Sequence, residues 1–557
     1  METKNTHQRT WWKEGIVHQI YPRSYQDTNG DGVGDLRGII QRLDYIKSLG
    51  VDIVWLNPIY ASPNDDNGYD ISDYRAIMSD FGTMEDFDEL LAEMHERGLK
   101  LVMDLVVNHS SDEHEWFVES RKNRDNPYRD YYHWWPAEKG KPNPRWSFFD
   151  VNSDAWMYDE TTDAYYLHYF SRKQPDLNWE NPKVREEVKD IMRFWLDKGI
   201  DGFRMDAFQV AAKDISFPEL PKGYEDDIFA AYGMQPGLHD YLREINRDVT
   251  SQYDVFTVAE GAGSTMQDAI DLSDPARKEL DMVYHFEISE YVKEPNDYDF
   301  RGLKSLFTKW DRGLADKGWN SIFLANHDIA RMVSRYGNDD PEYRIACSKC
   351  LNTLLMTMRG TPFTYYGDEL GMTNINFQRI EQYQDIEARN GYLAAKQKGE
   401  DMTAFMARLN AFSRDNSRTP MQWTAGENAS FTTGKPWLEV NPNHTTINVE
   451  DQDKDPASCL NYFRKLTAFR KANPLLVYGN YTPVAEDSEQ LFAYVRELDG
   501  KQLLVAMNWS EEAATLTLPE GFDRASVVLD NLEGKASLGI GEITLVAWQA
   551  VVLDRTR

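Results

Sequence analysis

Cysteine is scarce in this sequence, with three residues among 557, at positions 347, 350 and 459. So odd and sparse a set excludes a disulfide framework. Cys347 and Cys350 form a C-x-x-C pair, but no second pair accompanies them as a zinc site would require. Their segment has the pattern of a helix interior, so we interpret them as inert helix residues.

Long hydrophobic runs are also missing. No stretch approaches the roughly 20 apolar residues of a membrane span. The first residues lack the apolar core of a secretory signal peptide and lead directly into a predicted strand. We therefore expect a cytoplasmic protein with no membrane partner.

Positive charge is outnumbered, with 61 Lys and Arg residues against 92 Asp and Glu residues and a net charge of −31. Such a chain repels nucleic-acid phosphates and anionic lipids. The charge therefore argues against nucleic-acid and membrane partners and favours a small neutral substrate. We expect no organic cofactor, and a monomer or weak dimer.

What the sequence does contain is a repeated alternation of strand and helix patterns. The helical segments have typical starts, such as Thr83-x-x-Asp86, of capping-box type, and Asn181-Pro182, an N-cap followed by an N1 proline. A stripe from Leu36 to Ile46, closed by Gly50, predicts another helix. Eight apolar runs rich in β-branched residues separate the helices, at residues 15–25, 51–58, 99–108, 199–206, 255–260, 282–287, 321–328 and 363–369. Eight such alternations predict an α/β protein with a (β/α)8 TIM barrel, whose reactive groups lie at the carboxyl ends of the strands.

Two insertions and a different C-terminal pattern interrupt this alternation. Residues 105–174 are crowded with aromatic residues and have little helical period, which predicts a subdomain inserted after the third strand. A second, polar insertion spans about residues 372–448. We assign residues 1–104 and 175–478 to the barrel, 105–174 to the inserted subdomain, and 479–557 to a C-terminal antiparallel β-sandwich.

The C-terminal assignment rests on a hairpin signal. Asp499-Gly500 lies between predicted strands at 492–497 and 502–507, and later strands are predicted at 527–529 and 543–553.

Polar residues end four of the predicted barrel strands. These ends are Asp104 to His109, Gly202 to Asp206, Val258 to Glu260, and Asn326 to Asp328. Burying a carboxylate costs several kcal/mol unless it is paired, so such residues need a reason. A structural ion pair would explain one such end, but four ends in one barrel indicate a shared site.

Paired carboxylates at neighbouring strand ends are what glycoside cleavage requires. A retaining enzyme uses a carboxylate nucleophile and a protonated carboxylic acid about 5 Å apart. Asp206 and Glu260 end neighbouring strands and meet this requirement. We expect Arg204 to keep Asp206 ionised, and crowding among carboxylates to raise the pKa of Glu260.

Four short motifs identify a family resemblance over essentially the whole chain: DLVVNH (104–109), GFRMDAF (202–208), FTVAEG (256–261) and FLANHD (323–328). In this order and spacing they resemble the α-amylase superfamily of α-glucan hydrolases and transglycosylases. The resemblance implies that Asp206 is the nucleophile, Glu260 the acid/base and Asp328 a transition-state stabiliser. It also implies sugar contacts from His109, Arg204 and His327.

Three further motifs, GYDISDY (68–74), QPDLNW (174–179) and RDNSRTPMQW (414–423), resemble the oligo-1,6-glucosidase, dextran glucosidase and maltase group. In that group an Asp and an Arg, matched here to Asp70 and Arg414, grip the terminal glucose and close the pocket, and Tyr69 stacks on the same ring. The resemblance therefore implies an exo-acting α-glucosidase for small oligosaccharides. Taken alone, Arg414 would be read as a surface charge in a polar loop.

The loop after the first strand has an oxygen-rich spacing, Asp27-x-Asn29-x-Asp31-Gly-x-Gly-Asp35, similar to an EF-hand loop. It departs from that pattern because the twelfth position is Gly38. The resembling group has a calcium site here, which implies a structural Ca²⁺ bound by Asp27, Asn29, Asp31, Asp35 and the carbonyl of Val33. An Asx-turn loop without an ion is the alternative.

Two details bear on specificity. Ala207 follows the expected nucleophile at a position where 1,6-preferring members of the resembling group usually carry Val, so we expect activity on both 1,4 and 1,6 linkages. Most aromatic residues of the insertion are expected in its core, with Phe149 and Phe170 as candidates for the pocket wall.

Two other functions compete with hydrolysis. A sucrose isomerase of the same fold would keep the carboxylates but carry an Arg-Leu-Asp-Arg-Asp segment where this chain reads ISEYVKE (288–294). A non-catalytic barrel protein would be membrane-anchored and lack the carboxylates. We therefore favour hydrolysis.

Overall fold

The computed structural model describes residues 9–292 and 299–555. The last two residues of the segment 288–294, compared above with sucrose isomerases, lie outside the described residues. Within the described ranges, every helix is too short or too polar to cross a membrane.

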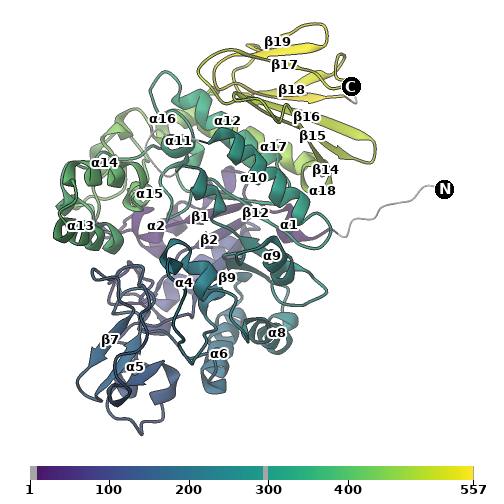
Figure 1. Ribbon diagram of the computed structural model, residues 1–557. Helices are drawn as coiled ribbons and strands as arrows, with labels where there is room; N and C mark the ends of the chain where they lie inside the picture. The colour runs from purple at the N-terminus through teal and green to yellow at the C-terminus, as the bar shows by residue number, and fades with distance from the viewer. Residues whose placement is uncertain (1–8, 293–298, 556–557) are drawn as a thin grey trace.

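A barrel of eight parallel strands forms the centre of the molecule (Figure 1). Neighbours around it follow the order β11-β10-β9-β5-β2-β1-β13-β12, and a parallel bridge between Val283 and Asn320 joins the two ends. The strands are β1 (Val17–Ile20), β2 (Ile53–Leu56), β5 (Lys100–Val106), β9 (Gly202–Asp206), β10 (Phe256–Glu260), β11 (Met282–Tyr284), β12 (Ser321–Ile322) and β13 (Thr361–Tyr365). Seven of the predicted runs contain one of these strands and the eighth overlaps β13, which begins two residues earlier than predicted, so the predicted (β/α)8 barrel is confirmed.

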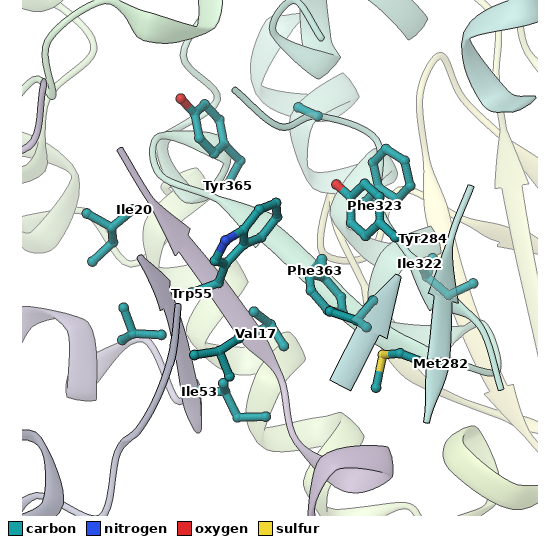
Figure 2. Packing of buried hydrophobic residues seen from close by; sticks show 14 of the residues in the cluster. Val17, Ile20, Ile53, Trp55, Met282, Tyr284, Ile322, Phe323, Phe363 and Tyr365 are labelled. Carbon is teal, nitrogen blue, oxygen red and sulfur yellow. The ribbon is translucent and has the colours of Figure 1, made fainter. Parts of the chain in front are cut away.

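The barrel interior is a packed hydrophobic core (Figure 2). Val17 of β1, Ile53 of β2 and Phe363 of β13 are buried, and Trp55 packs edge-on against Phe363 and Tyr284. These strands are buried along their whole length because helices cover their outer side, which explains why they read as continuous apolar runs.

The helices around the barrel begin and end largely as their sequences predict. Helix α4 (Met84–Glu96) has the capping box of Thr83 and Asp86, and α6 (Pro182–Lys198) is capped by Asn181. The stripe from Leu36 to Ile46 differs from the prediction: it forms two short helices, α2 (Leu36–Gln41) and α3 (Leu43–Ser48). The backbone of Arg42 leaves the helical region there, with φ −103° and ψ 4°. Other long helices of the barrel domain are α8 (Leu238–Asp248), α10 (Phe300–Gly313), α12 (Arg344–Thr357) and α17 (Cys459–Ala472).

The two insertions lie on the same side of the barrel (Figure 1). The first contains α5 (Glu115–Ser120) and a three-stranded antiparallel sheet of β6 (Trp134–Pro136), β8 (Ala164–Leu167) and β7 (Trp156–Asp159). The second is built around two helices, α13 (Ile386–Lys398) and α14 (Met402–Phe412). The strand β5 continues to Val106, two residues into the range assigned to the first insertion.

The C-terminal region consists of two antiparallel sheets. Asp499 and Gly500 both have positive φ in the turn between β15 (Leu491–Leu498) and β16 (Lys501–Asn508), as the hairpin signal predicts. The single strand predicted at 543–553 is wrong. It is two strands in different sheets, β20 (Glu542–Leu545) and β21 (Ala550–Asp554), because Trp548 adopts φ 52° and turns the chain between them.

The three cysteines are buried. Cys347 and Cys350 lie inside α12, and burial raises the pKa of both thiols far above the usual range. This environment agrees with the interpretation of the C-x-x-C pair as inert.

Candidate active site

The carboxyl ends of the barrel strands surround a small pocket. Asp206 ends β9, Glu260 ends β10, and Asp328 follows β12. The cavity, about 60 Å³, is lined by Asp66, Tyr69, His109, Phe149, Phe170, Asp206, Ala207, Glu260, His327, Asp328 and Arg414. Residues predicted from distant motifs therefore meet at one place, together with both aromatic candidates from the insertion, Phe149 and Phe170.

A single buried guanidinium holds the carboxylates in place. Nη1 of Arg204 is 2.5 Å from Oδ1 of Asp206 and 2.7 Å from Oδ1 of Asp104, and Nη2 is 2.5 Å from Oε1 of Glu260. The side chain of Arg204 is fully buried, so these contacts are shielded from solvent. Asp206 and Glu260 thus share one guanidinium, an arrangement that keeps the two carboxyl groups close together.

Burial dominates the ionisation of both carboxyl groups. It raises the pKa of Asp206 to about 7, although Arg204 opposes this rise. It raises the pKa of Glu260 to about 8, and the charges of Asp206 and Asp328 add to the effect. Arg204 thus lowers the pKa of Asp206 as expected without restoring its ordinary value. Burial thus raises the pKa of both carboxyl groups, and that of Glu260 is the higher of the two.

The residue after Asp206 has an unusual backbone that serves the site. Ala207 adopts a left-handed conformation, with φ 45° and ψ 23°. Its N–H donates a hydrogen bond of 2.6 Å to Oε2 of Glu260. Non-glycine residues rarely adopt this conformation, and such strain is concentrated at functional sites. The turn therefore links the position of one carboxyl group to the strand end of the other.

Asp328 is the strongly ionised member of the group. It accepts a hydrogen bond from Nη2 of Arg418 at 3.0 Å, and lies 3.3 Å from Nη1 of Arg414 and 3.0 Å from Nε2 of His327. These positive and polar neighbours hold its pKa well below the usual range despite burial.

Tyr69 and the two histidines form a neutral wall. The ring of Tyr69 stacks on His327 at 5.3 Å between ring centres, and its hydroxyl is 2.6 Å from His327 Nε2. Nε2 of His109 is 3.1 Å from the carbonyl oxygen of Tyr69. Burial lowers the pKa of His109 to about 3 and that of His327 well below its usual range. Both imidazoles are therefore neutral at physiological pH.

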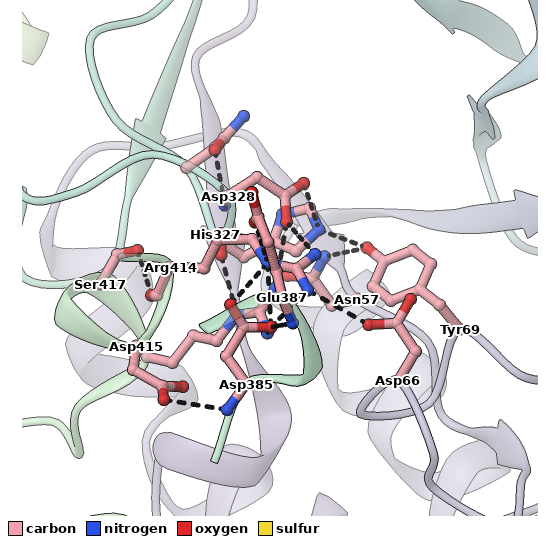
Figure 3. A network of polar contacts seen from close by, with 12 residues as sticks. Asn57, Asp66, Tyr69, His327, Asp328, Asp385, Glu387, Arg414, Asp415 and Ser417 are labelled. Atoms are coloured by element: carbon pink, nitrogen blue, oxygen red, sulfur yellow. Dashed lines mark hydrogen bonds and ion pairs between the residues drawn. The ribbon is translucent and has the colours of Figure 1, made fainter. Parts of the chain in front are cut away.

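The structure corrects the assignment of Asp70 as a sugar-gripping residue. Asp70 is fully buried, and its carboxylate accepts hydrogen bonds from the backbone N–H groups of Asp65 and Asp66, at 2.8 and 3.0 Å. Asp66 lines the pocket instead, with Oδ1 3.3 Å from Nη2 of Arg414 (Figure 3). Asp70 therefore shapes the loop, and Asp66 occupies the place predicted for Asp70.

Arg414 reaches the pocket as predicted, within an ionic network that sequence reasoning missed. Asp385, the N-cap of α13, accepts hydrogen bonds from Nε of Arg414 at 3.1 Å and also ion-pairs with Arg418 (Figure 3). Glu387 lies 3.4 Å from Nε of Arg414. Asp66 stands beside a recognised motif, but Asp385 lies in the polar insertion, where no pattern distinguishes it from surface charges.

A buried lysine supports the turn after Asp206. Nζ of Lys213 lies 3.0 Å from Oδ2 of Asp176 and donates to Oδ1 of Asn108 at 2.9 Å and to the Val210 carbonyl at 2.8 Å. It thereby ties the segment after β9 to the end of β5 and to the QPDLNW motif.

The oxygen-rich loop forms three successive Asx turns, which both the calcium loop and the alternative without an ion allow. Oδ1 atoms of Asp27, Asn29 and Asp31 accept hydrogen bonds from the N–H groups of Asn29, Asp31 and Val33, respectively. Asp35 instead caps α2 and bonds to Thr28. Among the described residues, no three His, Cys, Asp or Glu side chains gather closely enough to hold a metal ion. An ion would therefore depend on the Asn29 amide and the Val33 carbonyl. All the atoms that could bind an ion here are oxygens, which are the ligands that calcium prefers.

Family models, related sequences and solved structures all match this chain to α-amylase-type proteins. Residues 19–479 match the family described as alpha amylase, catalytic domain, and residues 491–552 match the alpha-amylase SusG C-terminal domain. The chain is 50% identical to an oligo-1,6-glucosidase of Parageobacillus thermoglucosidasius, over 98% of this chain and 99% of that protein. It is 52% identical to an oligo-1,6-glucosidase of Halalkalibacterium halodurans, over 90% of each. A solved isomaltulose synthase mutant from Erwinia rhapontici, in complex with sucrose, superposes with a TM-score of 0.96 at 42% identity, covering 99% and 100% of the chains.

Proposed function

The chain belongs to the α-amylase family, and from this premise we propose that it is an exo-acting, retaining α-glucosidase. It releases glucose from the non-reducing end of short oligosaccharides with α-1,6 linkages, α-1,4 linkages or both. Oligo-1,6-glucosidases aligned over nearly the full chain support the glycoside hydrolase activity.

The observation that carries the mechanism is the contact of one guanidinium with two carboxyl groups of different pKa. Arg204 contacts both Asp206 and Glu260, which favours a short distance between their carboxyl groups. Retaining enzymes have their two carboxyl groups about 5 Å apart, whereas inverting enzymes have them farther apart. The pKa order leaves Asp206 as the ionised nucleophile and Glu260 as the proton donor.

The reaction proceeds in two displacements. The Asp206 carboxylate attacks the anomeric carbon while Glu260 donates its proton to the glycosidic oxygen, so the C–O bond breaks and the aglycone leaves. Glu260, now a carboxylate, takes a proton from water, whose oxygen attacks the anomeric carbon and releases Asp206. Asp328, which stays ionised, accepts hydrogen bonds from hydroxyl groups of the bound sugar.

The exo mode rests on the closed end of the pocket. Asp66 and Arg414 lie 3.3 Å apart across it, and Arg414 is also held by Asp385. A charged pair of this kind blocks a continuing glucan chain and offers both donors and acceptors to a terminal glucose.

Release of glucose from a chromogenic α-glucoside tests the activity. NMR of the first product tests retention, since the covalent mechanism requires α-glucose first. β-Glucose appearing before mutarotation would eliminate it.

Sucrose isomerisation is the second candidate, because solved isomerases share the fold at 42–43% identity. Product analysis with sucrose separates the two. Glucose and fructose indicate hydrolysis, whereas a rearranged disaccharide indicates isomerisation.

A structural Ca²⁺ in the loop of Asp27, Asn29, Asp31 and Asp35 is also part of the proposal, with the Val33 carbonyl as a further ligand. Four oxygen-bearing side chains in one short loop support it. We further propose a cytoplasmic monomer or weak dimer, which sedimentation velocity and cell fractionation would test.

A further inference from the structure

The pairing of β9 with β10 stops just short of the two residues proposed to cleave the substrate. Its last partners are Met205 and Ala259, one residue before Asp206 and Glu260. The relative position of the two carboxyl groups therefore depends on contacts made beyond this pairing. The guanidinium that they share provides one such contact. The turn after Asp206 and the loop after Glu260 provide others.

One of these contacts comes from Gln209, which lies in the short helical turn η4 (Phe208–Val210) after Ala207. Gln209 is only 8% exposed. Its Oε1 accepts a hydrogen bond of 3.2 Å from the N–H of Gly263, in the loop after Glu260. Its backbone carbonyl accepts a hydrogen bond of 2.9 Å from the N–H of Met234, so Gln209 is itself anchored to the segment before α8.

The side-chain amide of Gln209 also packs against Gly261, the residue directly after Glu260. Gly261 has φ +100°, a conformation that L side chains rarely adopt. A Cβ atom added there would lie 2.3 Å from Cδ of Gln209 and 2.4 Å from its Oε1. Position 261 therefore needs glycine on two grounds, and this glycine allows the amide to lie against the backbone that follows the proposed proton donor.

Gln209 and Ala207 thus connect the same two segments at different points. The N–H of Ala207 donates to Oε2 of Glu260 at 2.6 Å, which orients the carboxyl group. The amide of Gln209 instead fixes the backbone just beyond Glu260. If the loop moved away from the turn, the bond from Ala207 would lengthen and Glu260 would lose its orientation. A displacement of about 1 Å at a reacting group can cost roughly 100-fold in rate.

We propose that Gln209 is a positioning residue for Glu260. By joining the turn after Asp206 to the loop after Glu260, it holds the proton donor where the glycosidic oxygen lies during cleavage. Gln209 transfers no proton and forms no bond to the sugar. The inference rests on the proposed glucosidase function. Because Gln209 acts through Glu260, its loss should affect mainly substrates whose leaving group needs a proton.

The dependence of kcat/KM on the leaving group tests this role. Cleavage of isomaltose requires Glu260 to protonate the departing sugar oxygen, whereas the fluoride of α-glucosyl fluoride departs with little help from an acid. In both cases kcat/KM reports the first displacement. Gln209→Met keeps the length of the side chain but removes its amide. It should lower kcat/KM for isomaltose by roughly tenfold or more, and that for α-glucosyl fluoride by no more than about threefold.

Gln235→Met is the matched control, because it removes the amide of a glutamine that bonds elsewhere. Nε2 of Gln235 donates to the carbonyl oxygen of Ala231 at 3.2 Å, in the segment before α8. This variant should keep the wild-type ratio of the two specificity constants. A loss of stability alone would reduce the folded fraction and therefore lower both constants equally, so the ratio separates positioning from a purely structural role.

An unchanged ratio in Gln209→Met would overturn the proposal, as would an equal change in Gln235→Met. If Gln209→Met does not fold, Gln209→Asn decides in its place, because its amide is one methylene too short to reach Gly263. A wild-type protein that cleaves neither isomaltose nor α-glucosyl fluoride would instead refute the glucosidase assignment.

Discussion

Replacing Asp66 by asparagine tests the correction that the structure makes to the sugar-binding pair. Oδ1 of Asp66 is 3.3 Å from Nη2 of Arg414 at the closed end of the pocket. Burial raises its pKa to about 7, while Arg414 and Arg418 oppose the rise. Asparagine has the same shape but cannot carry the negative charge, so the substitution removes charge and leaves packing intact.

The expected loss follows from one charged hydrogen bond to the sugar. Such a bond contributes about 1.5–3 kcal/mol. Its removal should therefore lower kcat/KM by roughly 10- to 150-fold. Arg414 retains Asp385 and Asp328 as partners, so the melting temperature should change little. The assay is kcat/KM on a chromogenic α-glucoside together with a thermal melt.

Asp70→Asn is the companion variant, because Asp70 holds the same loop without facing the pocket. Its carboxylate accepts two backbone hydrogen bonds, from Asp65 and Asp66, and the single carbonyl of asparagine cannot replace both oxygens. We expect it to lose about 1–3 kcal/mol of stability, with a smaller effect on kcat/KM. The reasoning is refuted if Asp70→Asn loses the greater share of kcat/KM at an unchanged melting temperature while Asp66→Asn remains near wild type.

Four further predictions concern the proposed catalytic groups, the metal loop and the linkage. Asp206→Asn and Glu260→Gln should each reduce turnover by orders of magnitude with the fold intact, and more than about a tenth of wild-type turnover in either would contradict its role. The kcat/KM profile should rise as Asp206 deprotonates near pH 7 and fall as Glu260 loses its proton near pH 8; Glu260→Gln should abolish the alkaline limb of any residual activity. Chelation should lower the melting temperature of the wild type but not of Asp31→Ala, and equal values with and without verified metal removal would count against the site. Ala207→Val should depress maltose turnover more than isomaltose turnover, by roughly 1–3 kcal/mol, and should also destabilise the turn because a β-branched residue tolerates φ 45° poorly; an unchanged ratio of specificity constants would assign the preference to other residues.

The barrel and its strand ends were predictable because their signals are local. A strand buried on both faces reads as a continuous apolar run, and a carboxylate at its end is conspicuous. Asp206 and Glu260 stood out for this reason, and parallel pairing placed them side by side.

For the loop that contains Asp66 and Asp70, the sequence predicted an acidic residue at the pocket but not which of the two it is. The motif around Tyr69 indicated an acidic partner for Arg414, but Asp66 and Asp70 are equivalent by chemistry and close in sequence. Which of them faces the pocket depends on the path of the loop backbone, since the carboxylate of Asp70 is consumed by two N–H groups of that loop.

By itself, the sequence determined the fold class, the chemistry of the reacting groups and the strand ends that carry them, because these follow from periodicity and from the cost of burying charge. Only the tertiary structure decided which side chains share a partner. Arg204 contacts Asp104, Asp206 and Glu260 at once, and Asp385 reaches Arg414 from an insertion that no motif marks. Such contacts join residues far apart in the chain, and their geometry is set by the closure of the barrel and the packing of its insertions rather than by any local pattern.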